Sequence, residues 1–139
     1  MFARSTNRLL CDYRKTLALA LLLPVSLAGC GDDRPPLVEV TGKVTFKGEP
    51  LTAGSIHFHP DAANSFQKDM PSSLLQLDGS YNIKTFPYGD GVPLGKYKVT
   101  LSPQLAARVE LPDYANVEKT PWTIEVTEVG VTDHVFEVK

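Results

Sequence analysis

Residues 38–46 read VEVTGKVTF, and the alternation in this stretch sets the expected fold class. Apolar or small residues occupy every second position, namely Val38, Val40, Gly42, Val44 and Phe46. The residues between them are Glu, Thr or Lys. Because successive side chains of a strand point to opposite faces, this pattern predicts a strand with one buried face and one solvated face.

The same two-residue period returns along the rest of the chain. It predicts further strands over residues 55–60, 73–77, 80–85, 96–102, 122–126 and 135–138. Turn residues such as Asp78-Gly79 separate these strands, and only residues 104–109 suggest a helical turn. Seven short strands with one apolar face each predict an all-β fold, a seven-stranded antiparallel sandwich of two sheets. We expect two long loops, over residues 61–71 and 103–121.

The first thirty residues have a different composition from the rest. Four Lys or Arg residues and one Asp precede residue 30, which gives that segment a net charge of +3. A run of about 13 apolar and small residues, broken by Pro24, follows the basic residues. This order is typical of a secretory signal, and the run is shorter than the roughly 20 residues that a membrane span needs. The sequence therefore predicts export.

The apolar run ends in Leu27-Ala28-Gly29-Cys30, which resembles the lipobox of bacterial lipoproteins. The resemblance implies cleavage before Cys30, a diacylglyceryl thioether on its sulfur and an acyl group such as palmitate on its nitrogen. The expected parts are then a signal peptide over residues 1–29, a lipidated cysteine and tether over 30–36, and the domain over 37–139. Two alternatives remain open at this point: a plain secretory signal with an accidental cysteine, and an uncleaved anchor.

Cysteine count and charge limit the function classes. Cys11 would leave with the signal peptide, so the mature domain would have no disulfide partner. The chain from Cys30 onward carries ten Lys or Arg against fifteen Asp or Glu, a net charge of −5. Nucleic-acid binding needs a basic face, so we expect no nucleic-acid partner. The expected membrane contact comes from the lipid on Cys30, and the choice between inner and outer membrane stays open.

A second resemblance covers residues 38–139. The motifs Val40-Thr41-Gly42-Lys43-Val44, Gly48-Glu49-Pro50-Leu51, Gly54-Ser55-Ile56-His57-Phe58, Asp78-Gly79-Ser80-Tyr81 and Pro93-Leu94-Gly95-Lys96-Tyr97-Lys98-Val99 resemble carboxypeptidase regulatory-like, or transthyretin-like, domains. Leu111-Pro112-Asp113-Tyr114 and Phe136-Glu137-Val138 are similar to small bacterial lipoproteins of this type. The resemblance implies a prealbumin-like sandwich that serves as a non-enzymatic accessory or interaction module of the cell envelope.

Three groups of side chains are candidates for binding. His57 and His59 leave one strand face and could share a metal ion with His134 as a third ligand, or they could simply be polar residues on the wet face. Asp90, between Gly89 and Gly91, offers one acidic oxygen ligand where calcium needs several, which favours a turn. We therefore expect no bound metal and no cofactor.

Aromatic residues in or near the loops suggest a different kind of site. Phe86, Tyr88 and Tyr114 could stack on sugar rings in a glycan or small-ligand site, or they could cover the open ends of the sandwich. No nucleophile with a base and no paired carboxylates stand out, so we expect no catalytic residues. Transthyretin-like hydrolases end in Tyr-Arg-Gly-Ser, whereas this chain ends in Phe136-Glu137-Val138-Lys139.

Overall fold

The computed structural model describes residues 33–139, and this part of the chain is dominated by β-strands. The all-β class is therefore confirmed. Within these residues, no helix is both long enough and apolar enough to cross a membrane. The elements in chain order are β1 (Leu37–Val38), β2 (Val40–Phe46), β3 (Glu49–Pro50), β4 (Ser55–Pro60), β5 (Ser72–Leu74), β6 (Ser80–Asn82), β7 (Lys84–Thr85), β8 (Gly89–Asp90), β9 (Val92–Pro93), β10 (Gly95–Leu101), α1 (Pro103–Arg108), the 3₁₀ helix η1 (Pro112–Ala115), β11 (Thr123–Val126) and β12 (Val131–Val138).

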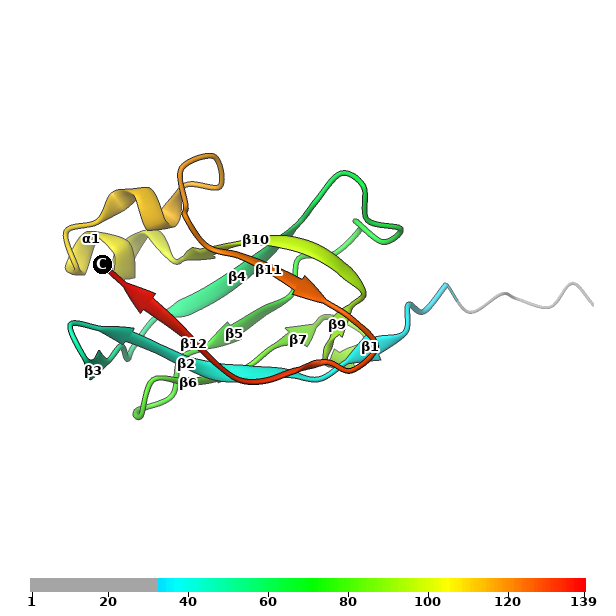
Figure 1. The fold of residues 1–139 in the computed structure, drawn as a ribbon, viewed down its shortest axis with the longest axis horizontal. Helices are drawn as coiled ribbons and strands as arrows, with labels where there is room; N and C mark the ends of the chain where they lie inside the picture. The colour runs from blue at the N-terminus through cyan, green and yellow to red at the C-terminus, as the bar shows by residue number, and fades with distance from the viewer. Residues whose placement is uncertain (1–32) are drawn as a thin grey trace, which may run out of the picture. The chain divides into compact units, whose positions relative to one another are not determined.

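The strands form two main sheets and one small ribbon (Figure 1). One sheet has six strands in the order β11-β10-β4-β5-β7-β8, and all its pairs are antiparallel. The other has the order β12-β2-β3, with β6 also paired to β2. The ribbon joins β1 to β9 and places Leu37 opposite Pro93.

One pairing differs from the expected antiparallel arrangement. The last strand, β12, runs parallel to β2, with Phe136 opposite Val44 and Val138 opposite Phe46. The register shifts between Val131 and His134, which marks a bulge. The expectation of a wholly antiparallel fold is corrected at this pair, because a sequence pattern specifies which face is buried but not the direction of the neighbouring strand.

The predicted strand over residues 80–85 is divided between the two sheets. β6 pairs with β2 in one sheet, whereas β7 pairs with β5 and β8 in the other. Tyr81 and Ile83 are both buried, at 2% and 0% exposure, so the predicted inward face is confirmed. The two-residue alternation of buried and exposed side chains continues while the chain crosses from one sheet to the other. The alternation alone therefore does not reveal the crossing.

The two main sheets meet through aromatic side chains. The ring of Phe58 on β4 lies 6.3 Å from that of Phe136 on β12, measured between centroids, and the two rings are nearly perpendicular. Phe136 also lies 4.9 Å from Trp122 and 6.1 Å from Tyr81. Such contacts stabilise a core beyond the area that they bury. Phe136 therefore joins both sheets and the segment that leads into β11.

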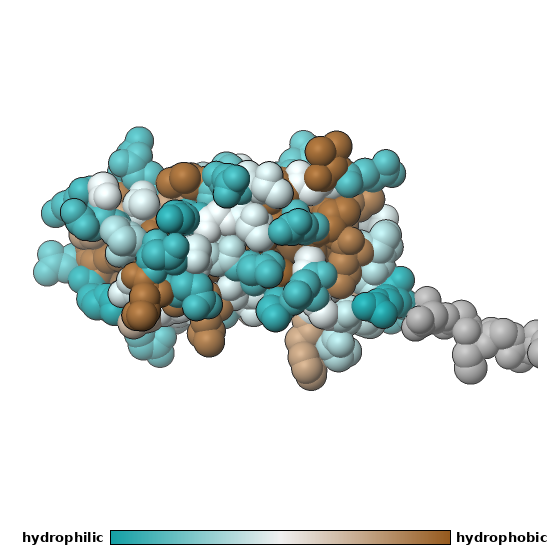
Figure 2. Space-filling model, turned by 90° about the horizontal axis from the view of Figure 1, so that it is seen from below, coloured by the Kyte–Doolittle hydropathy of each residue, from teal (hydrophilic) through white to brown (hydrophobic). Residues whose placement is uncertain are grey.

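The two expected loop regions both contact the rest of the domain. In the β4–β5 loop, the Asn64 amide donates to the Lys96 carbonyl at 2.8 Å and accepts from the Lys96 N–H at 2.9 Å. The expected helical turn is present as α1, and its Leu105 and Ala106 are buried. These contacts hold both regions against β10 or the core. The face shown in Figure 2 mixes hydrophilic residues with several separate apolar areas.

Candidate functional site

The expected lipidation site, Cys30, lies outside the described residues, but the segment that follows it is described. Arg34 donates from its guanidinium to the Tyr88 carbonyl at 2.7 Å, and the Asp33 carboxylate lies 3.7 Å from the Lys68 ammonium. A shallow hollow between this segment and the β7–β8 hairpin is lined by Arg34, Pro35, Pro36, Leu37, Tyr88, Gly89 and Asp90. Part of the expected tether is thus held against the domain.

The two strand histidines lie on the outer face of the six-stranded sheet. Their neighbours Ile56 and Phe58 are fully buried, so the predicted division of faces on this strand is confirmed. His57 Nε2 shares a 2.8 Å hydrogen bond with the Ser55 hydroxyl, and His59 Nε2 shares one of 2.8 Å with the Thr100 hydroxyl. Both histidines are half-buried, so they are part of the packed surface of the sheet.

The environment favours the neutral form of both rings. Burial lowers the pKa of His57 below its ordinary value, and its buried Nδ1 has no hydrogen-bond partner within residues 33–139. Burial also lowers the pKa of His59, with a smaller contribution from the nearby charge of His57. At His57, a protonated imidazole would hold an N–H donor at Nδ1 with no acceptor among the described residues, which costs free energy. Protonation of either ring is therefore expected to lower the stability of the fold.

The geometry gives little support to the metal hypothesis. The Nε2 atoms of His57 and His59 are engaged by hydroxyl groups. The expected third ligand, His134, is on β12 in the other sheet, where its ring lies 4.6 Å from Phe136. Residues 33–139 contain no group of three or more His, Cys, Asp or Glu side chains that could hold a metal ion.

The Gly89-Asp90-Gly91 segment considered for calcium consists of β8 and the residue that follows it. The Asp90 carboxylate forms a 2.8 Å ion pair with Lys84 across β7 and β8. The Thr85 hydroxyl donates to the Gly91 carbonyl at 2.7 Å, so this oxygen is also engaged. The glycines on either side have φ angles of 118° and 109°, which only glycine adopts readily. The hairpin geometry and these contacts therefore explain the Gly-Asp-Gly motif without a bound calcium ion.

The three loop aromatics separate into different environments. Tyr114 is only 7% exposed and packs against Trp122, with 4.8 Å between the centroids, so it covers one end of the core. Tyr88 packs edge-on against Phe66 of the β4–β5 loop at 5.7 Å. Phe86, at the tip of the β7–β8 hairpin, is 85% exposed. Only Phe86 presents a largely free ring to solvent.

The structure also identifies two sheet edges on one side of the domain. Among the described residues, β12 pairs only with β2, and β11 pairs only with β10 (Figure 1). β12 has eight residues, more than any other described strand, and its Val135 side chain is 55% exposed. Alternate peptide groups of such a strand point away from the sheet and can pair with another chain.

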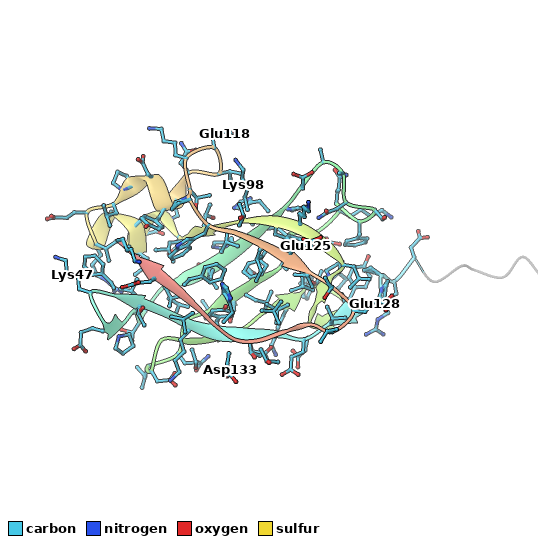
Figure 3. All side chains as sticks on the ribbon, viewed as in Figure 1. Lys47, Lys98, Glu118, Glu125, Glu128 and Asp133 are labelled. Atoms are coloured by element: carbon cyan, nitrogen blue, oxygen red, sulfur yellow. The ribbon has the colours of Figure 1, made fainter. Side chains whose placement is uncertain are left out.

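Acidic residues accompany this side of the domain. Glu125 is on β11, Glu128 is in the turn after it, and Asp133 is at the bulge of β12 (Figure 3). Glu137 is also on β12 but forms a 3.0 Å ion pair with Lys139. Charges and bulges are common on edges that must resist indiscriminate pairing. Within residues 33–139 this edge is left without a neighbouring strand, and the local sequence does not reveal it because the topology depends on distant contacts.

No family model, curated protein or solved structure matches this chain. The resemblance to transthyretin-like domains stays a prediction that depends on the quoted motifs.

Proposed function

We propose that this chain is a bacterial lipoprotein, cleaved before Cys30 and held at a membrane by lipid on that residue, with its domain facing the periplasm or the cell exterior. The observation that carries the proposal is the order of basic segment, short apolar run and Leu27-Ala28-Gly29-Cys30. The position of the domain supports it, because β1 begins at Leu37, only a few residues after Cys30. Cleavage there would leave the folded part whole.

We further propose that the domain is a transthyretin-like sandwich and serves as a non-enzymatic interaction module of the envelope. The two facing sheets joined through Phe136 support the sandwich. The edge of β12, which no other strand of residues 33–139 covers, supports the interaction role, because an extended partner segment could add to it as a further strand. Acidic neighbours such as Asp133 would favour a partner segment that carries basic residues.

The anchor is tested by metabolic labelling with an alkyne fatty acid in the native host. The wild type and Cys11→Ser are expected to incorporate the label, because Cys11 belongs to the segment that is removed. Cys30→Ser is expected to incorporate none and to migrate as the longer precursor. Acylation of the Cys30→Ser variant, or an unlabelled wild type, would overturn the proposal.

The interaction surface is tested by photo-crosslinking in native membranes. A crosslinking residue at Glu137, on β12, is expected to give a discrete product, and one at the exposed Glu118 in the loop before β11 serves as the control. Adding Val135→Lys is expected to abolish the product, because a charge on an edge strand opposes pairing. Equal products from both positions, or a product that Val135→Lys leaves unchanged, would count against strand addition.

The alternative of glycan or small-ligand binding is supported by fewer exposed aromatic rings than the sequence suggests. Tyr114 is inside the domain and Tyr88 packs on Phe66, which leaves Phe86 as the exposed ring. A glycan array with the wild type and Phe86→Ala would test it. Binding that disappears with the substitution would support this alternative.

A further inference from the structure

We propose that the tips of the β7–β8 hairpin and the β11–β12 turn dip into the bilayer, so that Phe86 and Val129 dock the domain on the membrane that anchors it. The inference rests on the proposed lipid at Cys30. Beyond the anchor itself, the inference specifies the orientation of the domain, with one defined end facing the lipid. The occupant of this apolar end is the membrane surface itself.

Chain length fixes which end of the domain faces the membrane. Asp33 follows Cys30 by three residues, so their Cα atoms can be at most about 11 Å apart. Residues 33 and 34 do not extend freely from the domain. Asp33 forms an ion pair with Lys68, and Arg34 donates to the Tyr88 carbonyl at 2.7 Å. The lipid would therefore hold the β7–β8 hairpin close to the membrane.

The same end includes the β11–β12 turn. The Val131 N–H donates to the Glu39 carbonyl at 2.9 Å, and a Cβ added at Gly130 would come within 2.6 Å of the same oxygen. Glu39 follows β1, which starts three residues after Arg34. Figure 1 shows β1, β9 and this turn together at the end where the described chain starts, and Figure 3 places Glu128 there. The segment that follows the anchor thus contacts both the β7–β8 hairpin and the β11–β12 turn.

Both reversals carry an apolar side chain at the tip. Phe86 is 85% exposed and Val129 is 93% exposed. Exposed apolar side chains also occur elsewhere, for example Leu74 at 72% and Leu77 at 93%, so exposure alone identifies no membrane-facing surface. The tether distinguishes these two from Leu74 and Leu77, because Phe86 is on the hairpin that contacts Arg34 and Val129 is in the turn that contacts Glu39.

Charge cannot supply this contact. The ionic groups near this end are largely paired, as Lys84 is with Asp90 and Lys68 is with Asp33, and Glu128 adds a negative charge. A basic cluster that would attract anionic lipids is not present among these residues. Apolar tips can still enter the interface, because an aromatic or aliphatic side chain gains free energy when it leaves water.

The test uses the acylated mature protein in phosphatidylcholine vesicles that contain a nitroxide-labelled lipid. Phe86, Val129 or Leu77 is replaced singly by Cys and labelled with a fluorophore, which is selective because the Cys30 sulfur would carry lipid. Leu77 is the matched control, since its exposure equals that of Val129 but it lies next to the Asp78-Gly79 turn. This turn is close to Pro50 of β3, at the opposite end of the domain from β1 (Figure 1). The probes at 86 and 129 are expected to be quenched severalfold more strongly than the probe at 77.

A second variant tests whether the apolar tip itself holds the domain down. Phe86→Ser is expected to weaken quenching of a probe at position 129, whereas Leu74→Ser is expected to leave it unchanged. Equal quenching at positions 86, 129 and 77 in acylated protein would overturn the docking inference alone. An intact mass without acyl groups would overturn the anchor, and the docking inference with it.

Discussion

Gly42 is the position where one added methyl group should do the most damage to the proposed interaction edge. A Cβ atom there would lie 2.5 Å from the Tyr81 hydroxyl and 2.8 Å from the His134 carbonyl carbon. The bulge of β12 creates this close approach, and the Tyr81 hydroxyl donates to the His134 carbonyl at 3.1 Å. Gly42→Ala must therefore displace the backbone of β12 or the buried tyrosine.

The magnitude follows from two costs. Overpacking a well-filled site costs about 1–3 kcal/mol, and a buried hydroxyl that loses its partner costs about 1–3 kcal/mol. We therefore expect Gly42→Ala to lower the free energy of unfolding by about 2–6 kcal/mol, measured by urea unfolding of the acyl-free mature chain. Gly48→Ala is the control, because Gly48 has a φ of 84° but no other atom within 4 Å of the added Cβ.

The outcome of the control decides what the loss means. Gly48→Ala is expected to cost about 1 kcal/mol, from the left-handed backbone alone. If Gly42→Ala were no more destabilising than Gly48→Ala, the close packing of β12 on β2 at the bulge would be refuted.

Three further predictions concern the sheet surface, the core and an exposed ion pair. Because the folded-state pKa values of His57 and His59 are lowered, the fold should have its full stability above the ordinary histidine pKa of 6.5 and lose stability as the pH falls below it. The urea midpoint of the wild type should therefore be higher at about pH 7.5 than at about pH 5.5, and the difference should be smaller for a variant with both histidines replaced by Gln. Equal differences in the two proteins would contradict this prediction. Phe136→Ala should cost about 3–5 kcal/mol in urea unfolding, and a cost below about 1 kcal/mol would show that the sheets do not meet there. Lys84→Ala should cost at most about 1 kcal/mol, since its pair with Asp90 is exposed, and a double-mutant cycle with Asp90→Ala would reveal any stronger coupling.

The sequence was most informative where side-chain alternation decides burial. Ile56 and Phe58 point into the core, and the segment 55–60 forms a strand with the predicted bounds. Tyr97 and Val99 are buried as expected, and β10 differs from its predicted range by one residue at each end. A two-residue period arises from the strand itself, so local sequence suffices to predict it.

The remaining features depend on contacts between distant segments. The parallel direction of β12, its start at Val131 rather than 135 and its bulge follow from packing on β2. The contact of Arg34 with Tyr88 joins residues 54 positions apart, and nothing local marks Arg34 as held in place. Among the candidate site residues, the burial of Tyr114 and the exposure of Phe86 likewise required the fold.

The central claim is that Cys30 is the lipidated first residue of the mature protein. The most direct test is the intact mass of the protein purified from the membranes of its native host. The account predicts a chain that begins at Cys30 and carries the added mass of a diacylglyceryl group and an acyl group. A chain that begins elsewhere and carries no lipid would contradict it.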